Sequence, residues 1–241
     1  GKKIAGPADQ AENEVELLDQ GVEDLMGHVR ELMAQVAKDQ ETRRQLELSV
    51  IQMQIHPHFL YNTLYAIKGL CDMGMTKDAS EMITALANFF RVGLSCGHEL
   101  IPVEEELSHV RNYLFIQEMR YGDDFSYRID AAPDILHCSI IKLTLQPLVE
   151  NAIYHGVKEK RGQGHILVKG WQQDGMLCFL VEDDGMGMTP ERLQELKRGF
   201  AETRQDGAVV GFGVYSVYER LRLHYGTEAG LEIESEWGKG T

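Results

Sequence analysis

A regular spacing of apolar residues near the N-terminus places the tightest constraint on how this chain can fold. The residues recur at alternating intervals of three and four: Val15, Leu18, Val22, Leu25, Val29, Leu32 and Val36. This 3.5-residue period, with valine at one seam position and leucine at the other, favours a parallel two-stranded coiled coil. The same stripe could instead pack against the rest of its own chain, and the sequence leaves that alternative open.

The seam has a weak point. Continuing the same frame gives Asp39, Arg43, Leu46, Val50 and Met53. Polar side chains at Asp39 and Arg43 lower the stability of a coiled coil, so we expect the pairing to be weakest there. Such a position either fixes the register of the two helices or acts as a switch, and the sequence does not decide between these roles.

The composition excludes several classes of protein. Lys and Arg total 24 against 38 Asp and Glu, and the resulting net charge of −14 opposes binding to nucleic acid. No apolar run approaches the ~20 residues that a membrane span needs, and the N-terminus shows no signal-peptide pattern. The four cysteines form no C-x-x-C pair, so the sequence suggests neither a zinc site nor a disulfide framework.

Three helices are expected after the seam. The first runs from residue 54 to about 73, with a kink at Pro57, and the second from residue 80 to 94. The third, from residue 103 to about 121, opens with the acidic residues 104–106, which favour a helix N-terminus. Two antiparallel helices, paired with those of a second copy, would form a four-helix bundle.

The character of the sequence changes after residue 121. Of the 24 glycines, 15 lie from Gly156 onward. Short β-like runs are expected at residues 125–129, 165–171, 177–182 and 231–236, separated by helical stretches. The predicted fold class is therefore α+β, with a layer of helices on one sheet. We expect three regions: a signalling helix (1–45), dimerisation helices (46–121) and a C-terminal domain (122–241).

Polar residues on one predicted helix of the C-terminal domain could carry chemistry. Asn151, His155 and Lys158 share a face of that helix. An amide, an imidazole and an ammonium there could serve a metal, a base and a phosphate. Polar residues on a helix face can also simply meet water, so this cluster does not identify a site by itself.

Two further clusters contain glycine. Asp183 directly follows an apolar strand, where its carboxylate could accept a hydrogen bond from an exocyclic amine. Gly185 and Gly187 would let the backbone pass close to a flat ring, although an ordinary Asp-Gly turn is the alternative. Gly211 and Gly213 open a predicted helix, whose free N–H groups could bind an anion.

The order of these clusters resembles the ATP-binding domain of the GHKL group, which contains histidine kinases, DNA gyrase, a heat-shock chaperone and the mismatch-repair ATPases. Residues 189–210 would form a mobile lid, and Gly238-Lys-Gly-Thr241 resembles the group's G-x-G-T motif. The run Gln54-Ile-His-Pro-His-Phe-Leu-Tyr-Asn-Thr-Leu64 resembles the histidine box of the LytS/YesM-type sensor histidine kinases, P-H-F-[LI]-[FY]-N. The spacing to Arg120 is also similar to that family.

The resemblance implies a set of functional residues. His58 would accept a phosphoryl group, and Asn62, one helical turn later, would orient the imidazole or a water. His56 is the competing acceptor, but residues two apart on a helix face different directions. The implied ATP site comprises Asn151, which would also bind Mg²⁺, His155 near the nucleoside, Lys158 near the phosphates, Asp183 at the adenine amine, Gly185, Gly187, Gly211, Gly213 and Thr241.

The implied reaction is ATP-dependent autophosphorylation of His58, followed by transfer to an aspartate of a response regulator. The chain would form a homodimer through its N-terminal helices, and a hinge near residue 122 would bring His58 to the γ-phosphate. Asn13-Glu-Val-x-x-Leu18 resembles the second helix of a HAMP module, so the chain would be the cytoplasmic part of a membrane receptor with a separate sensor region. The resemblance also implies a further strand after Thr241.

Two departures from the group's pattern keep alternatives open. Most other histidine kinases carry an acid directly after the histidine, whereas Phe59 stands there, so the base is not identified. A nucleotide-gated dimeric module without autokinase activity is therefore the second hypothesis. A GHKL-type ATPase or chaperone would need an acid one turn before Asn151, where Pro147 stands. Glu150 could be a base or an exposed carboxylate.

Overall fold

The structure of this chain is a computed structural model. It describes residues 26–29, 31–33, 35–36, 38, 57–93, 99–122, 125–160, 163–201 and 212–241. The chain divides into two compact units, residues 1–51 and 52–241. In the first unit, every described residue is α-helical, and Val29, Leu32 and Val36 of the predicted seam are exposed. The rest of that seam, with Asp39 and Arg43, lies outside the described residues.

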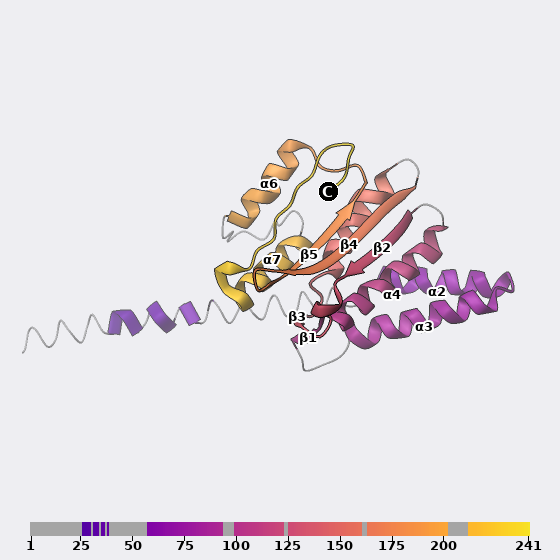
Figure 1. Cartoon of the computed structure of the whole chain (residues 1–241), viewed down its shortest axis with the longest axis horizontal. Helices are drawn as coiled ribbons and strands as arrows, with labels where there is room; N and C mark the ends of the chain where they lie inside the picture. The colour runs from indigo at the N-terminus through magenta and orange to yellow at the C-terminus, as the bar shows by residue number, and fades with distance from the viewer. Residues whose placement is uncertain are drawn as a thin grey trace, which may run out of the picture. The chain divides into compact units, whose positions relative to one another are not determined.

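Three helices begin the second unit and lie side by side: α2 (Pro57–Asp72), α3 (Thr76–Gly93) and α4 (Val103–Tyr121) (Figure 1). All three were expected from the sequence. Pro57 is the first residue of α2, a position that tolerates proline because its missing N–H would be unpaired there anyway. The expected helical residues 54–56 lie outside the described part, and α3 begins four residues earlier than predicted.

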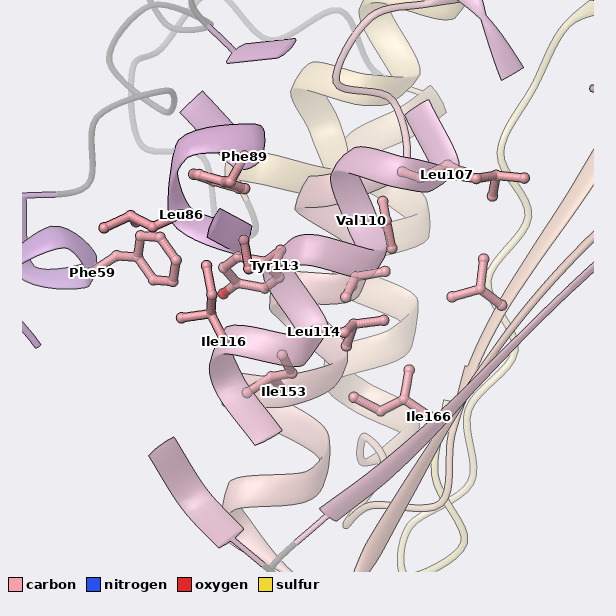
Figure 2. Packing of buried hydrophobic residues seen from close by; sticks show 14 of the residues in the cluster. Phe59, Leu86, Phe89, Leu107, Val110, Tyr113, Leu114, Ile116, Ile153 and Ile166 are labelled. Carbon is pink, nitrogen blue, oxygen red and sulfur yellow. The ribbon is translucent and has the colours of Figure 1, made fainter. Parts of the chain in front are cut away.

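Aromatic side chains join the three helices. The ring of Phe59 on α2 lies 5.1 Å from that of Phe89 on α3 and 5.3 Å from that of Tyr113 on α4. Figure 2 shows these rings between the helices, with Leu86 and Ile116 beside them. All three aromatic residues are at most 4% exposed, so the face of α2 next to His58 is fixed by core packing.

Removing the central ring should cost much of the stability of this unit. We expect Phe89→Ala to lower the free energy of unfolding by about 3–5 kcal/mol, because it leaves a cavity among three helices. Ile83→Ala is the matched control, since Ile83 is 53% exposed on the same helix. Urea unfolding followed by circular dichroism measures both variants, and equal losses would contradict this packing.

The sheet of the second unit has three strands in the order β2 (Phe125–Ala131), β4 (Gly164–Gln173) and β5 (Met176–Asp183). β2 and β4 are parallel, and β4 and β5 are antiparallel. Buried and more exposed residues alternate along β4, and Ile166 and Val168 belong to the buried cluster. Helices therefore cover one face of the sheet, which confirms the α+β prediction.

Shorter elements connect the sheet to the site. The strands β1 (Leu100–Pro102) and β3 (Ser139–Ile141) pair with each other and were not predicted. The helical elements are η2 (Pro133–Ile135), α5 (Gln146–Asn151), the π-helical η3 (Ala152–Gly156), η4 (Val157–Glu159), α6 (Pro190–Ala201), α7 (Phe212–Tyr225) and η5 (Gly226–Glu228). No helix in the described part of the chain is long and apolar enough to cross a membrane.

One expected strand is absent from the structure. Residues 231–236 form no strand, and the only ladder contact there is an isolated bridge between Glu236 and Gly240. The expected boundary near residue 122 stays a prediction, and β1 before it pairs with β3 after it. The buried cluster also continues across this point, so α4 packs with the sheet as well as with α3.

The expected lid contains regular structure. Residues 190–201 of the 189–210 segment form α6 instead of an irregular loop, and the ring of Phe200 lies 4.8 Å from that of Tyr218 on α7. Residues 202–210 lie outside the described part. An aromatic contact therefore ties the first half of the segment to the helix that follows it.

Candidate active site

The candidate phosphoacceptor lies on the outer face of α2. His58 is exposed, and the side-chain nitrogen of Asn62 lies 3.1 Å from its Nδ1 and 3.0 Å from its Nε2. An asparagine amide carries both a donor and an acceptor, so it can hold either tautomer of a neutral imidazole. The predicted spacing of one helical turn thus brings these two side chains together, as expected.

Asn62 should affect the rate of phosphorylation without affecting nucleotide binding. We expect Asn62→Ala to slow label incorporation by about 10- to 100-fold, because a freely rotating imidazole is rarely in line for attack. Lys68→Ala is a control on an exposed position of the same helix, where Lys68 forms an ion pair with the neighbouring Asp72. Single-turnover phosphorylation measures the effect, and an unchanged rate would rule out this orienting role.

A second group of predicted residues meets at the end of β5. Asp183 is 7% exposed, and its Oδ1 accepts a hydrogen bond of 2.9 Å from the N–H of Gly185. A Cβ on Gly156 would lie 2.3 Å from that same Oδ1, and one on Gly185 would lie 2.2 Å from the carbonyl carbon of Gly156. Only glycine fits at these two positions, so the helix 146–159 and the end of β5 approach backbone to backbone.

The C-terminal residues complete this end of the site. Asp183 and Thr241 exchange two backbone hydrogen bonds, of 2.9 and 3.2 Å. Gly187 has φ +64°, and a Cβ there would lie 2.2 Å from the carbonyl oxygen of Glu236. The structure therefore brings the predicted residues Asp183, Gly185, Gly187 and Thr241 into one cradle, together with Gly156.

Burial raises the pKa of Asp183 to about 6, although hydrogen bonds from Gly185 and Thr241 oppose the shift. A carboxylate that accepts a hydrogen bond from an amine must be ionised. We therefore expect nucleotide affinity to fall about tenfold for each pH unit below about 6. Titration calorimetry from pH 5 to 8 tests this, and Asp183→Asn should show no such slope because an amide does not titrate.

The stability of the nucleotide-free protein should change in the opposite direction. The folded form holds the proton of Asp183 more tightly than the unfolded form, whose pKa is near 3.8. The resulting stabilisation is present below pH 3.8 and is lost as the pH rises through about 6. If the free energy of unfolding that Asp183 contributes instead increased between pH 3.8 and about 6, the raised pKa of Asp183 would be contradicted.

The other end of the cradle lies between α5 and α7. Asn151 is the last residue of α5, and its Nδ2 is buried with no hydrogen-bond partner in the part of the chain that the structure describes. A Cβ on Gly213, at the start of α7, would lie 3.8 Å from that nitrogen. The structure thus brings Asn151 and Gly213 together, whereas Gly211 lies outside the described residues.

The predicted common face of Asn151, His155 and Lys158 does not form. The helix changes from α to π geometry after Asn151, which alters the residues per turn and leaves His155 exposed. The Nζ of Lys158 lies 4.4 Å from the ring centroid of Tyr154 and 4.7 Å from that of Tyr121 on α4. Lys158 is therefore directed at α4, while Asn151 faces α7.

Sequence reasoning missed the buried polar residues of α4. Glu106 is fully buried and His109 is 1% exposed. The Nε2 of His109 lies 2.6 Å from Oε1 of Gln146 on α5, and its ring stacks on Phe89 at 4.5 Å. The signal was available, because Glu106, His109 and Tyr113 fall at helical spacing on the stripe that the apolar residues of α4 define.

Comparison with known families agrees with this geometry. Residues 46–125 match the family model described as histidine kinase. Residues 139–241 match the model described as histidine kinase-, DNA gyrase B-, and HSP90-like ATPase. The chain belongs to the histidine kinase family. The part of this histidine kinase that contains Asn151, Asp183 and Gly213 is accordingly an ATP-binding domain.

Curated relatives extend the match over most of the chain. Sensor histidine kinase YesM of Bacillus subtilis (strain 168) is 33% identical over 97% of this chain and 38% of its own length. Sensor protein LytS of Bacillus cereus is 32% identical over 81% of this chain and 33% of its own length. Sensor protein kinase HptS of Staphylococcus aureus (strain USA300) is 29% identical over 95% of this chain and 43% of its own length. The chain thus spans well under half of each relative.

Proposed function

We propose that this chain is the catalytic part of a sensor histidine kinase that uses ATP to phosphorylate His58. The observation that carries the proposal is the presence of two built sites in one chain. One is an exposed imidazole held by Asn62, and the other is a glycine-lined cradle around a buried Asp183 with an unpaired Asn151 amide at its other end. Neither site alone would specify phosphoryl transfer to a histidine.

We propose that the two ends of the cradle bind the two ends of the nucleotide. Asp183 would accept a hydrogen bond from the adenine amine at the end closed by Gly156, Gly185 and Thr241. Asn151 and Gly213 would face the phosphates, where N–H groups at the start of α7 favour negative charge.

Mg²⁺ would fit at the phosphate end, where the protein and the nucleotide would both supply ligands to it. Among the described residues, no group of three or more His, Cys, Asp and Glu side chains could hold a metal by itself. Asn151 would offer its side-chain oxygen, and ATP would supply further oxygens, an arrangement that Mg²⁺ commonly accepts. When bound, Mg²⁺ neutralises charge on the phosphates.

The chemical step is an in-line displacement. A neutral imidazole nitrogen of His58 attacks the γ-phosphorus, the bond to the β,γ-bridging oxygen breaks, and ADP leaves with that electron pair. The proton on the other ring nitrogen is then released, directly or through Asn62, whose amide lies within 3.1 Å of both ring nitrogens. Phe59 is 4% exposed in the aromatic core, so the residue after the histidine supplies no base here.

For the reaction, His58 must approach the cradle. Hydrogen bonds tie α4 to the ATP-binding part through Glu106 and His109. Aromatic and apolar contacts join α4 to α2 and α3. We propose that the helices that carry His58 move relative to the ATP-binding part, and the expected hinge near residue 122 stays a prediction.

The relatives support a proposal for the partners and the cellular context of this chain. We propose that the chain dimerises through its N-terminal helices and passes the phosphoryl group to an aspartate of a response regulator. The relatives are named as sensors, and this chain matches well under half of each one. We therefore propose that it forms the cytoplasmic part of a membrane receptor.

Incubation with γ-labelled ATP tests the proposal. The wild-type chain should acquire label that is stable to base and labile to acid, and removal of Mg²⁺ with EDTA should prevent this. Bound ATP without any label would favour the second candidate, a nucleotide-gated module without autokinase activity. That candidate draws its support from the buried Phe59 after His58.

A further inference from the structure

A turn between β3 and α5 is held from two sides by polar side chains. The turn comprises residues 142–145 and immediately precedes the helix that ends at Asn151. Leu143 within it has φ +59°, a left-handed conformation that a leucine rarely adopts. A bulky residue in this conformation persists only where its surroundings fix the backbone.

Glu106 of α4 holds one side of the turn. Its Oε2 accepts a hydrogen bond of 2.9 Å from the N–H of Leu143, and its Oε1 accepts one of 2.8 Å from the N–H of Leu145. Glu106 has no exposed surface. Both carboxylate oxygens of a fully buried acid are therefore committed to the backbone of this turn.

Arg220 of α7 holds the same turn through its carbonyl groups. Its Nη1 donates a hydrogen bond of 3.1 Å to the carbonyl oxygen of Leu143, and its Nη2 donates one to the carbonyl oxygen of Lys142. Glu106 lies close enough to interact electrostatically with this guanidinium. Arg220 follows Gly213 by seven residues, two helical turns, so both lie on one face of α7.

The geometry points to a clamp in which Glu106 and Arg220 are positioning residues for the phosphate end of the ATP site. Through the turn, Arg220 fixes α7, whose first turn contains Gly213, relative to the helix that carries Asn151. Through Glu106, the same turn is fixed to α4. This inference rests on the proposed function, because it assumes that Asn151 and Gly213 face the phosphates while Asp183 faces the adenine.

The clamp predicts a difference between two ligands. Adenosine would use only the Asp183 end, whereas ATP with Mg²⁺ would use both ends. We expect Glu106→Gln and Arg220→Met each to weaken ATP binding by about tenfold or more, a difference of about 1.4 kcal/mol. Adenosine binding should change by less than about twofold. Arg220→Lys should fall between Arg220→Met and wild type, because an ammonium cannot donate to two carbonyl groups as a planar fork does.

Titration calorimetry with ATP and Mg²⁺, and nuclear magnetic resonance titration with adenosine, measure the ratio of the two affinities. Leu86→Ala is the control for lost stability, since Leu86 is buried on α3. The double variant Glu106→Gln/Arg220→Met should bind ATP about as weakly as either single variant, because the clamp acts as a unit.

A selective loss of ATP affinity in both single variants would support the clamp. Equal weakening of both ligands, or an equally altered ratio in Leu86→Ala, would overturn it and leave a purely structural role. An unchanged ratio would overturn the clamp while the proposed function stands. A wild-type chain that binds neither ligand would instead overturn the proposed function, and the clamp with it.

Discussion

The variant His58→Ala should acquire no acid-labile label from ATP while still binding the nucleotide. Alanine removes the only nitrogen nucleophile at this position, and no other residue can occupy the place that Asn62 and the exposed face of α2 define. Nucleotide binding should persist, because the cradle is built from residues 151–241 and contains no atom of α2. Filter-bound radioactivity and titration calorimetry on the same preparation measure the two properties.

Two other histidines serve as controls for this result. His56→Ala tests the competing acceptor of the same motif, and His224→Ala removes a histidine of α7 that lies 3.9 Å from Glu99. Both variants should retain most of the label. If His56→Ala abolished the label and His58→Ala kept it, the choice between the two residues would be reversed.

Asn151→Ala should cause the second large loss of phosphorylation, because it changes the site proposed for ATP, the other reactant. Asn151 is the one predicted ligand for Mg²⁺, and its buried Nδ2 finds no partner among the described residues. We expect phosphorylation to fall by about 100-fold or more, since misplaced phosphates lose in-line geometry. Adenosine binding at the Asp183 end should change little.

Asn112 offers a matched asparagine outside the site. Its side chain donates a hydrogen bond to the carbonyl oxygen of Ser108 on the same helix, so Asn112→Ala controls for loss of a helical amide. Asn151→Asp keeps an oxygen ligand and should retain more activity than Asn151→Ala. Full activity in Asn151→Ala would remove this residue from the phosphate end.

The sequence predicts those parts of the fold that local patterns determine. Helices α2, α3 and α4 are recognisable because their apolar residues recur at helical spacing, and β4 because it contains a short β-like apolar run, residues 166–168. The pairing of His58 with Asn62 follows from one helical turn. The cradle at Asp183 could be expected from its glycines, because a residue with a Cβ would not allow the backbone segments to approach so closely.

The remaining features depend on contacts between distant segments. Residues 104–106 read as an acidic helix start, yet Glu106 is buried because its oxygens bind the turn at residues 143 and 145. The strand β3 is only three residues long, so its pairing with β1 leaves no periodic signal. Lys158 leaves the face of Asn151 because a π-helical segment intervenes, and composition does not reveal such a change of helix type.

The boundary near residue 122 illustrates the same limit. The change from helical to glycine-rich sequence is real, but it coincides with a change of element inside one packed unit. Glu106 and His109 of α4 form hydrogen bonds with residues that follow β3, so contacts cross the predicted boundary. Composition reports what each segment forms, and it does not report which segments pack together.

The most direct test of the central claim is to map the phosphorylated residue in the wild-type chain. After reaction with ATP and Mg²⁺, proteolysis at alkaline pH and mass spectrometry would locate the phosphate on a peptide. We expect a single major phosphorylated site, on the imidazole of His58, and this phosphate should be lost on brief acid treatment. An acid-stable phosphate on serine, threonine or tyrosine, or a phosphohistidine at another position, would contradict it.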